Sequence, residues 1–96
     1  MALNDYITLG RSGLRVSPFC LGAMTFGEDW GFGSSVEDSV QILDAYIAKG
    51  GNFIDTANIY TKGHSEKIIG DHVGKDAGKR DRLVIATKFL SNMYVG

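Results

Sequence analysis

Three residues of types that can carry acid–base chemistry lie in the second half of the chain: Asp55, Tyr60 and Lys88. Asp55 falls within one short apolar run, and Lys88 directly follows another, over residues 83–87. Lysine is rarely buried without a partner, because removing its ammonium group from water is costly. The positions leave two interpretations open: strand ends that simply reach solvent, or a buried ammonium group paired with a carboxylate.

Tyr60 follows Asp55 by five positions and falls in the loop predicted over 58–63, at the same end of the sheet. On position alone, its side chain serves either ordinary loop packing or chemistry. A positive charge beside a phenol favours the phenolate form and so makes the phenol a stronger acid. If Lys88 lies beside it, Tyr60 is therefore a candidate general acid near neutral pH.

The strands that must position these side chains are predicted from a continuous apolar run at 19–24, a short run at 52–57 that carries Asp55, and a buried run at 83–87. Continuous apolar runs of this length are typical of strands buried on both faces, as in a parallel sheet. Two shorter alternating runs around a glycine-bearing turn predict a hairpin over about 6–17. Neighbouring parallel strands lie ~5 Å apart, so the carboxylate and the ammonium group are expected to form an ion pair.

Two helices are predicted between these strands. The first spans about 35–49, begins at a capping-box pattern of Ser34 and Glu37, and ends at a left-handed Gly50. Its apolar positions are Val36, Val40, Leu43 and Ile47. The second helix is predicted to begin at a cap formed by Ser65, and its apolar positions are Ile68, Ile69 and Val73. The stretches expected to form loops are 25–34, 58–63, 74–82 and 89–96. Alternation of strand and helix favours an α/β fold with a parallel sheet.

Composition excludes several classes of protein. The formal net charge is −1 over 96 residues, which argues against a nucleic-acid partner. No apolar run approaches the ~18 residues that span a bilayer, so no membrane partner is expected. The single Cys20 can form neither an internal disulfide nor a multi-cysteine metal site, and it is predicted to be a small buried apolar residue. We therefore expect no metal and a reducing, cytoplasmic setting.

Several segments resemble the aldo-keto reductase superfamily. They are Phe-Ile-Asp-Thr-Ala-Asn-Ile-Tyr at 53–60, Ser-Glu-Lys-Ile-Ile-Gly at 65–70 and Ala-Thr-Lys at 86–88. The segments at 9–17 and 20–27 resemble its branch of aryl-alcohol dehydrogenases and potassium-channel β-subunits. The resemblance covers nearly the whole chain, and the order and spacing of its motifs make it specific.

The resemblance implies an eight-stranded (β/α)8 barrel, also called a TIM barrel, whose bottom is closed by an N-terminal hairpin. It implies NADP(H)-dependent reduction of small aldehydes and ketones to alcohols. Barrels of this type need about 250 residues, so residues 1–96 are interpreted as the N-terminal segment of one barrel domain. Within it, the hairpin covers about 6–17 and the β/α units about 18–96. The remainder of the barrel, missing or in a separate chain, is then the expected partner, and the isolated chain is expected to be inactive.

By matching motif, Asp55, Tyr60 and Lys88 correspond to three members of the family's catalytic tetrad. Tyr60 is implied to donate a proton to the carbonyl oxygen, and Lys88, held by Asp55, to make the phenol more acidic. The fourth member is a histidine beyond residue 96. His64 and His72 do not match it, and surface or capping roles are predicted for both.

The resemblance also implies sites for the cofactor and the substrate. Asp55 and the turn after the first barrel strand are implied to lie near the nicotinamide ribose; the turn comprises Gly22, Ala23 and Met24. Phe26 and Trp30 either line the carbonyl pocket or take part in ordinary loop packing.

Two alternatives compete with this interpretation. A dinucleotide-binding glycine fingerprint is not met, because Gly31 and Gly33 are followed by no third glycine in register. The second alternative is a non-catalytic NADPH-binding or regulatory module on the same barrel, since a fold alone does not decide function. The presence of Asp55, Tyr60 and Lys88 together favours the enzyme.

Overall fold

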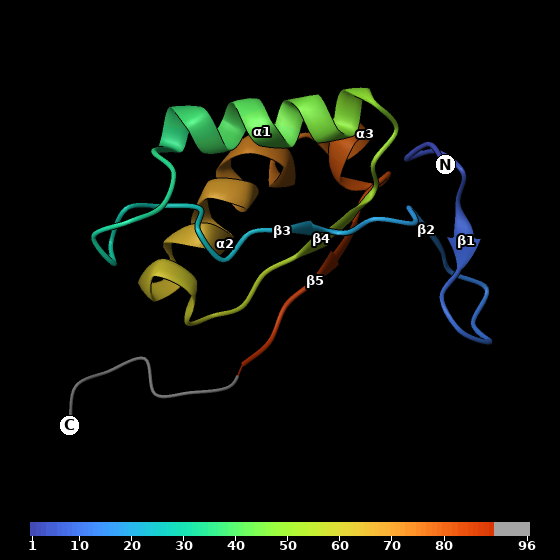
Figure 1. The fold of residues 1–96 in the computed structure, drawn as a ribbon, viewed down its shortest axis with the longest axis horizontal. Helices are drawn as coiled ribbons and strands as arrows, with labels where there is room; N and C mark the ends of the chain where they lie inside the picture. Colours follow the sequence, from blue (N-terminus) through green and yellow to red (C-terminus); the bar gives the residue numbers. More distant parts are fainter. Residues whose placement is uncertain (90–96) are drawn as a thin grey trace.

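The computed structural model describes residues 1–89 of the chain, and Figure 1 shows its course. The strands are β1 (Ile7–Thr8), β2 (Arg15–Val16), β3 (Leu21–Gly22), β4 (Phe53–Asp55) and β5 (Val84–Ala86). The helices are α1 (Val36–Ala48), α2 (His64–Ile69) and α3 (Ala77–Arg80). The order of hairpin, strand, helix, strand, helix and strand confirms the predicted one. Most of the loop predicted over 89–96 lies outside the described residues.

Strands β3, β4 and β5 form a parallel sheet in sequence order. One row across the sheet joins Leu21, Ile54 and Ile85, and the next row joins Gly22, Asp55 and Ala86. Successive residues of a strand point to opposite faces, so the two rows belong to different faces. We call them the helix face, which packs against α1 and α2, and the open face, which carries no helix in the described chain (Figure 1).

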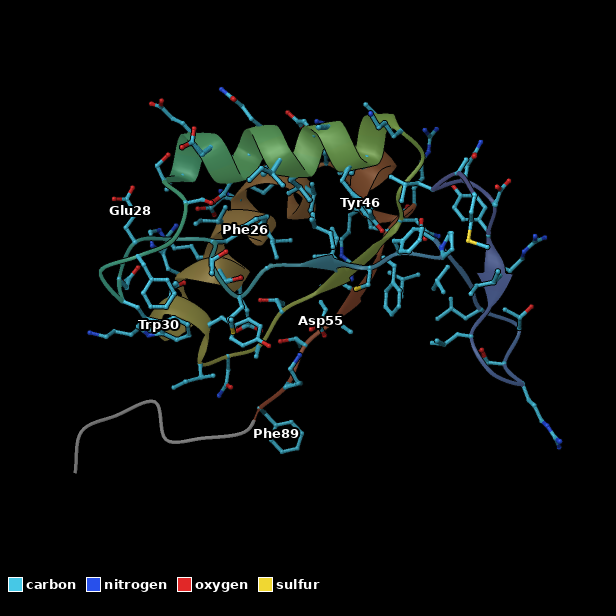
Figure 2. The ribbon with its side chains drawn as sticks, viewed as in Figure 1. Phe26, Glu28, Trp30, Tyr46, Asp55 and Phe89 are labelled. Carbon is cyan, nitrogen blue, oxygen red and sulfur yellow. The ribbon has the colours of Figure 1, made fainter. Side chains whose placement is uncertain are left out.

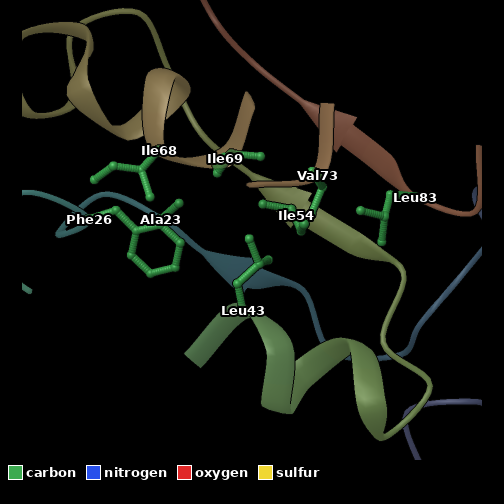
Figure 3. Packing of buried hydrophobic residues seen from close by; sticks show 8 residues of the cluster. All are labelled: Ala23, Phe26, Leu43, Ile54, Ile68, Ile69, Val73 and Leu83. Atoms are coloured by element: carbon green, nitrogen blue, oxygen red, sulfur yellow. The ribbon is translucent and has the colours of Figure 1, made fainter. Parts of the chain in front are cut away.

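The hydrophobic core lies on the helix face (Figure 3). It contains Leu43 from α1, Ile54 from β4 and three apolar side chains from α2 and the turn that follows it. All are at most 3% exposed. The cluster comprises Ala23, Phe26, Leu43, Ile54, Ile68, Ile69, Val73 and Leu83. Burial of these apolar groups is what holds both helices on the sheet.

Helix α1 departs from its prediction at its first turn. The N-cap is Ser35 rather than Ser34, and its Oγ accepts a hydrogen bond from the Asp38 amide at 3.1 Å. Val36 is predicted to be on the apolar face but is 48% exposed, because this turn extends past the end of the short sheet (Figure 1). The predicted end is confirmed: Gly50 is left-handed with φ +91°, and its amide donates to Ile47.

Tyr46 joins α1 to the amino-terminal ends of β3 and β4. Its hydroxyl lies 2.8 Å from the Phe19 carbonyl and 2.9 Å from the Phe53 carbonyl, and it accepts from the Phe53 amide at 3.2 Å. Gly51 allows this approach, because a Cβ at that position would overlap the tyrosine ring. Figure 2 shows the ring between α1 and the strands.

The second helix begins differently from its prediction. Its N-cap is the left-handed Gly63, whereas Ser65 lies inside the helix, fully buried, and donates to the Ala23 carbonyl at 2.7 Å. The helix then widens into a π turn, Gly70–Gly74. The three predicted apolar positions are nevertheless confirmed as buried. Helix α3 lies within the stretch predicted to be a loop, and Asp76 caps it by accepting from the Lys79 amide.

Burial of residues 19–24 on both faces is a wrong prediction. Phe19 is 60% and Met24 49% exposed, and Cys20 is exposed as well. For Cys20 and Met24, which alternate with Leu21 and Ala23 of the helix face, the reason is that the open face has no facing layer in the part of the chain that the structure describes. Burial and the nearby Asp55 carboxylate still raise the pKa of the Cys20 thiol above its usual range.

The hairpin of β1 and β2 is confirmed, with Ile7 opposite Val16. It is attached to the amino-terminal end of β4 through Asn52, whose Oδ1 accepts from the Ser17 amide at 2.7 Å. This end of the sheet is opposite to the end that carries Asp55. Within residues 1–89, no helix has the length and the apolarity needed to cross a bilayer.

Candidate active site

Asp55 and Lys88 lie together at the carboxyl end of the sheet, on the open face. Asp55 is the last residue of β4, and Lys88 follows β5 by two positions. Hydrogen bonds between the two segments continue past the strands: the Thr56 amide donates to Ala86, and the Asn58 amide donates to Lys88, each at 2.8 Å. This pairing fixes Lys88 beside the chain that leaves β4. Figure 2 shows Asp55 on the side of the strands away from α1.

The predicted ion pair is present, but it is not buried. Lys88 Nζ donates to Asp55 Oδ1 and to the Thr56 carbonyl, each at 2.8 Å. The two charged side chains are 45% and 41% exposed. Their exposure corrects the expectation of a buried ammonium group, and it has the same cause as that of Cys20: the open face is uncovered. The hydrogen bond that Lys88 donates to Asp55 raises the pKa of Lys88 above its usual value, more than partial desolvation lowers it.

Tyr60 completes the cluster. It begins a 3-10 turn, Tyr60–Gly63, and its amide donates to the Ala57 carbonyl at 3.3 Å. Lys88 Nζ lies 5.2 Å from the centroid of the Tyr60 ring, within the ~6 Å over which a cation is attracted to an aromatic face. The structure therefore brings together the three residues whose types and spacing first indicated acid–base chemistry.

The two histidines occupy places apart from this cluster. His64 is the first residue of α2, and its Nδ1 lies 3.0 Å from Asp29 Oδ1. His72 lies in the π turn, and its Nε2 is 2.6 Å from Asp44 Oδ1 on α1. Both make partly exposed contacts between neighbouring segments, and within residues 1–89 neither forms a hydrogen bond or an ion pair with Lys88.

The residues predicted to lie near a cofactor divide between the two faces. Gly22 stands opposite Asp55 in the sheet register, and among residues 1–89 no atom outside its two chain neighbours lies within 4 Å of the position that a Cβ would take there. Met24 is half exposed. Ala23 is fully buried, and its amide donates to the Asp55 carbonyl at 2.9 Å. The Ala23 side chain belongs to the core, and the expected place of this turn near a nicotinamide ribose stays a prediction.

The two aromatic residues predicted for the substrate pocket also separate. Phe26 is 2% exposed and packs in the core, so the loop-packing alternative describes it and the pocket-lining role does not. Trp30 is half-buried at the tip of the β3–α1 connection, 6.0 Å from the Phe32 ring with the planes tilted by 44°. Its predicted role in the pocket stays a prediction.

Thr61 is the residue of this region that the sequence analysis missed. It directly follows Tyr60, is fully buried, and has a positive φ of 47°. Glycines in a sequence indicate turns, because glycine readily adopts positive φ. Nothing in the sequence indicates that a threonine adopts this conformation.

Comparison with known proteins decides the family. The sequence profile of the Aldo/keto reductase family matches residues 18–96. The chain belongs to this family. Its hairpin and its three parallel strands with their helices are accordingly the first part of a TIM barrel.

Individual relatives in sequence and structure agree with the family assignment. The chain is 52% identical over 81 residues to the aldo-keto reductase ausK of Emericella nidulans, covering 81% of this chain and 20% of that protein. It is 48% identical to the aryl-alcohol dehydrogenase [NADP(+)] of Phanerodontia chrysosporium, covering 80% of this chain and 21% of that protein. The structure matches the aldo-keto reductase AKR11C1 of Bacillus halodurans with a TM-score of 0.70 and 28% identity, over 85% of this chain and 24% of that one. The chain thus spans about a fifth of the length of these curated relatives.

Proposed function

We propose that residues 1–96 are the N-terminal segment of a single barrel domain that catalyses reversible hydride transfer between NADP(H) and a small aldehyde or ketone. The supporting observation is the cluster on the open face, in which Lys88 Nζ is bound to Asp55 and lies 5.2 Å from the Tyr60 ring. Membership of the family and the name of the NADP(+)-dependent relative support the reaction type and the cofactor. The remaining strands of the barrel would come from outside this segment.

The chain's own residues account for the proton in this reaction. Carbonyl reduction adds a hydride to the carbon and a proton to the oxygen. Tyr60 would donate its hydroxyl proton to the oxygen as the carbon–hydrogen bond forms. The ammonium group of Lys88 then stabilises the phenolate that remains, and Asp55 keeps this ammonium group in place. In alcohol oxidation the same phenolate would accept the proton.

The open face has features that suit a nicotinamide cofactor, which would supply the hydride. Asp55 is 41% exposed, and no hydrogen bond within residues 1–89 reaches its Oδ2, so this oxygen can accept one from a ribose hydroxyl. Gly22 stands beside it with open space over its Cα. Gly22, Met24 and Asp55 are therefore the residues that we propose to hold the nicotinamide half.

The test is Tyr60→Phe in the full-length protein. The variant keeps the ring and removes the proton donor, so kcat should fall by roughly 10²–10⁴-fold while NADPH binding stays nearly unchanged. Tyr6→Phe is the matched control: it removes a hydroxyl that donates to Gly50 at the opposite end of the sheet, and kcat should be unaffected. If Tyr60→Phe keeps more than about a third of the wild-type kcat, Tyr60 is not the acid.

Measurement of NADPH oxidation also tests the alternative that the protein is a non-catalytic binding or regulatory module. A full-length protein that binds NADPH but oxidises it with no member of a panel of aromatic and aliphatic aldehydes and ketones would be a binding module. Oxidation of NADPH that depends on both the carbonyl and Tyr60 would establish the reductase.

A further inference from the structure

The backbone takes an unusual course directly after Tyr60. Thr61 has φ 47° and ψ 41°, and Lys62 has φ 59° and ψ 34°, so two consecutive residues with side chains are left-handed. They are the only non-glycine residues with positive φ in the described chain. A β-branched residue disfavours this conformation, because its Cβ crowds the neighbouring carbonyl oxygen. Such backbone persists where its surroundings hold it, and it concentrates at functional sites.

The Thr61 side chain shows what holds this turn. It is fully buried, and its Oγ1 lies 2.7 Å from the Phe26 carbonyl and 2.8 Å from the Tyr60 carbonyl. The hydroxyl has one proton, which the two carbonyl oxygens share. Phe26 lies in the β3–α1 connection, 35 residues earlier in the chain. Thr61 therefore binds the turn that carries Tyr60 to a segment whose position is fixed by the core.

The β3–α1 connection is shaped to receive Thr61. Gly27 has φ +105°, and a Cβ at that position would lie only 2.9 Å from Thr61 Oγ1. The glycine thus gives both the backbone angle and the space for a close approach. A second link lies beside it, between His64 Nδ1 and Asp29 Oδ1 at 3.0 Å. The two segments meet as one packed contact rather than as two independent loops.

We propose that Thr61 is a positioning residue for the reaction: its hydroxyl holds the Tyr60 turn against the β3–α1 connection, so that the Tyr60 ring stays over the Lys88 ammonium group. The inference rests on the proposed function, because Thr61 acts through Tyr60. A glycine would adopt a positive φ here without steric conflict, as Gly63 does with φ 92° in the same turn. What threonine adds at this position is the hydroxyl.

The first test compares Thr61→Val and Thr61→Ser in the full-length protein. Valine keeps the branched shape and removes the hydroxyl, whereas serine keeps the hydroxyl. We expect Thr61→Val to lower kcat roughly 10- to 100-fold with little change in KM for the carbonyl, because the acid is misplaced while the binding surface remains. Thr61→Ser should recover most of the lost kcat. Lys62→Gly is the matched control, since it relieves the neighbouring left-handed residue without removing the tether, and it should leave kcat unchanged.

A double-mutant cycle separates positioning from general damage. If Thr61 acts through the phenol, Thr61→Val should lower the residual activity of Tyr60→Phe by less than about twofold. A loss in that background as large as in the wild type would show that Thr61 acts independently of Tyr60, and it would overturn the inference.

Two further outcomes also decide the matter. An unchanged kcat in Thr61→Val, or a Thr61→Ser variant as impaired as Thr61→Val, would contradict the positioning role. If Thr61→Val does not fold, Thr61→Gly replaces it, because glycine accepts the left-handed backbone, and full kcat in that variant overturns the inference. The proposed function fails separately, when Tyr60→Phe itself stays active.

Discussion

Ile54 and Asp55 are consecutive residues of β4, yet they lie in opposite surroundings. Ile54 points to the helix face, is fully buried and packs against Leu43 and its neighbours in the core. Asp55 points to the open face, is 41% exposed and binds Lys88. The alternation of side chains along one strand thus separates the residues that stabilise the segment from those that we propose for chemistry.

Only one of the two faces is complete within residues 1–89. On the helix face, α1 and α2 already cover the apolar row of the sheet. On the open face, the charged cluster and exposed groups such as Cys20 and Met24 have no facing strands within residues 1–89. Variants on the helix face should therefore change stability, and variants on the open face should change activity.

We expect the largest effect when the segment is produced without the remaining strands of the barrel, so that nothing covers the open face. Residues 1–96 expressed alone should be aggregated, molten or assembled with a complementing chain, because both edge strands and the exposed apolar groups lack partners. This chain should neither bind NADPH tightly nor reduce carbonyls. Sedimentation, urea unfolding and NADPH fluorescence test this. A monomer that unfolds cooperatively and binds NADPH with micromolar affinity would contradict it.

Removing the cation of the open face should abolish most activity. Lys88→Met in the full-length protein leaves Asp55 without its partner and Tyr60 without the neighbouring charge, so kcat should fall by on the order of 10²-fold or more. The pH–rate profile should shift as well. Lys67→Met is the matched control, because it removes a lysine–aspartate pair with Asp71 on the helix surface. Near-normal activity and an unchanged pH–rate profile in Lys88→Met would contradict the proposed coupling between Lys88 and Tyr60.

Trimming the core on the helix face should show the opposite pattern. Leu43→Ala in the full-length protein should lower the free energy of unfolding by about 2–5 kcal/mol, because a fully buried side chain leaves a cavity. The kcat of the folded fraction should stay near the wild-type value. Chemical denaturation measures the first quantity, and active-site titration with turnover measures the second. A large loss of kcat at unchanged stability would contradict the assignment of stability to the helix face and of activity to the open face.

The smallest effect concerns the protonation of Lys88. Its pKa is raised by Asp55, so the contribution of the pair to folding is fully present below the pKa of a free lysine, about 10.4, and is lost as the pH rises through the raised value. A titration of the Lys88 side chain by NMR in the full-length protein should give a midpoint above 10.4, and Asp55→Asn should lower it. A midpoint that Asp55→Asn does not move would assign the shift to another group.

Much of the helix face could be predicted from the sequence, because it is built from local patterns. The spacing of Leu43 and its apolar neighbours predicted α1, and Ile68, Ile69 and Val73 predicted the buried side of the second helix. The ion pair of Asp55 and Lys88 was also predictable, since parallel strands bring their carboxyl ends together.

What the sequence could not settle depends on longer-range context. Ser34 and Ser35 are adjacent hydroxyls, each three residues before a carboxylate, so the pattern fits two cap positions equally. The exposure of Cys20 follows from the absence of facing strands, which no local pattern records. The role of Thr61 depends on a carbonyl 35 residues away, so nothing near it in the sequence indicates the contact.

The contact of Tyr46 with Gly51 has a consequence for how this segment can evolve. The tyrosine hydroxyl meets backbone atoms of both Phe19 and Phe53, and its ring occupies the space that a Cβ at position 51 would need. A lineage can therefore acquire a side chain at position 51 only after the aromatic ring at position 46 has been lost or has moved. Substitutions at these two positions, five residues apart, are therefore linked, because the side chain at one limits which residue the other can carry.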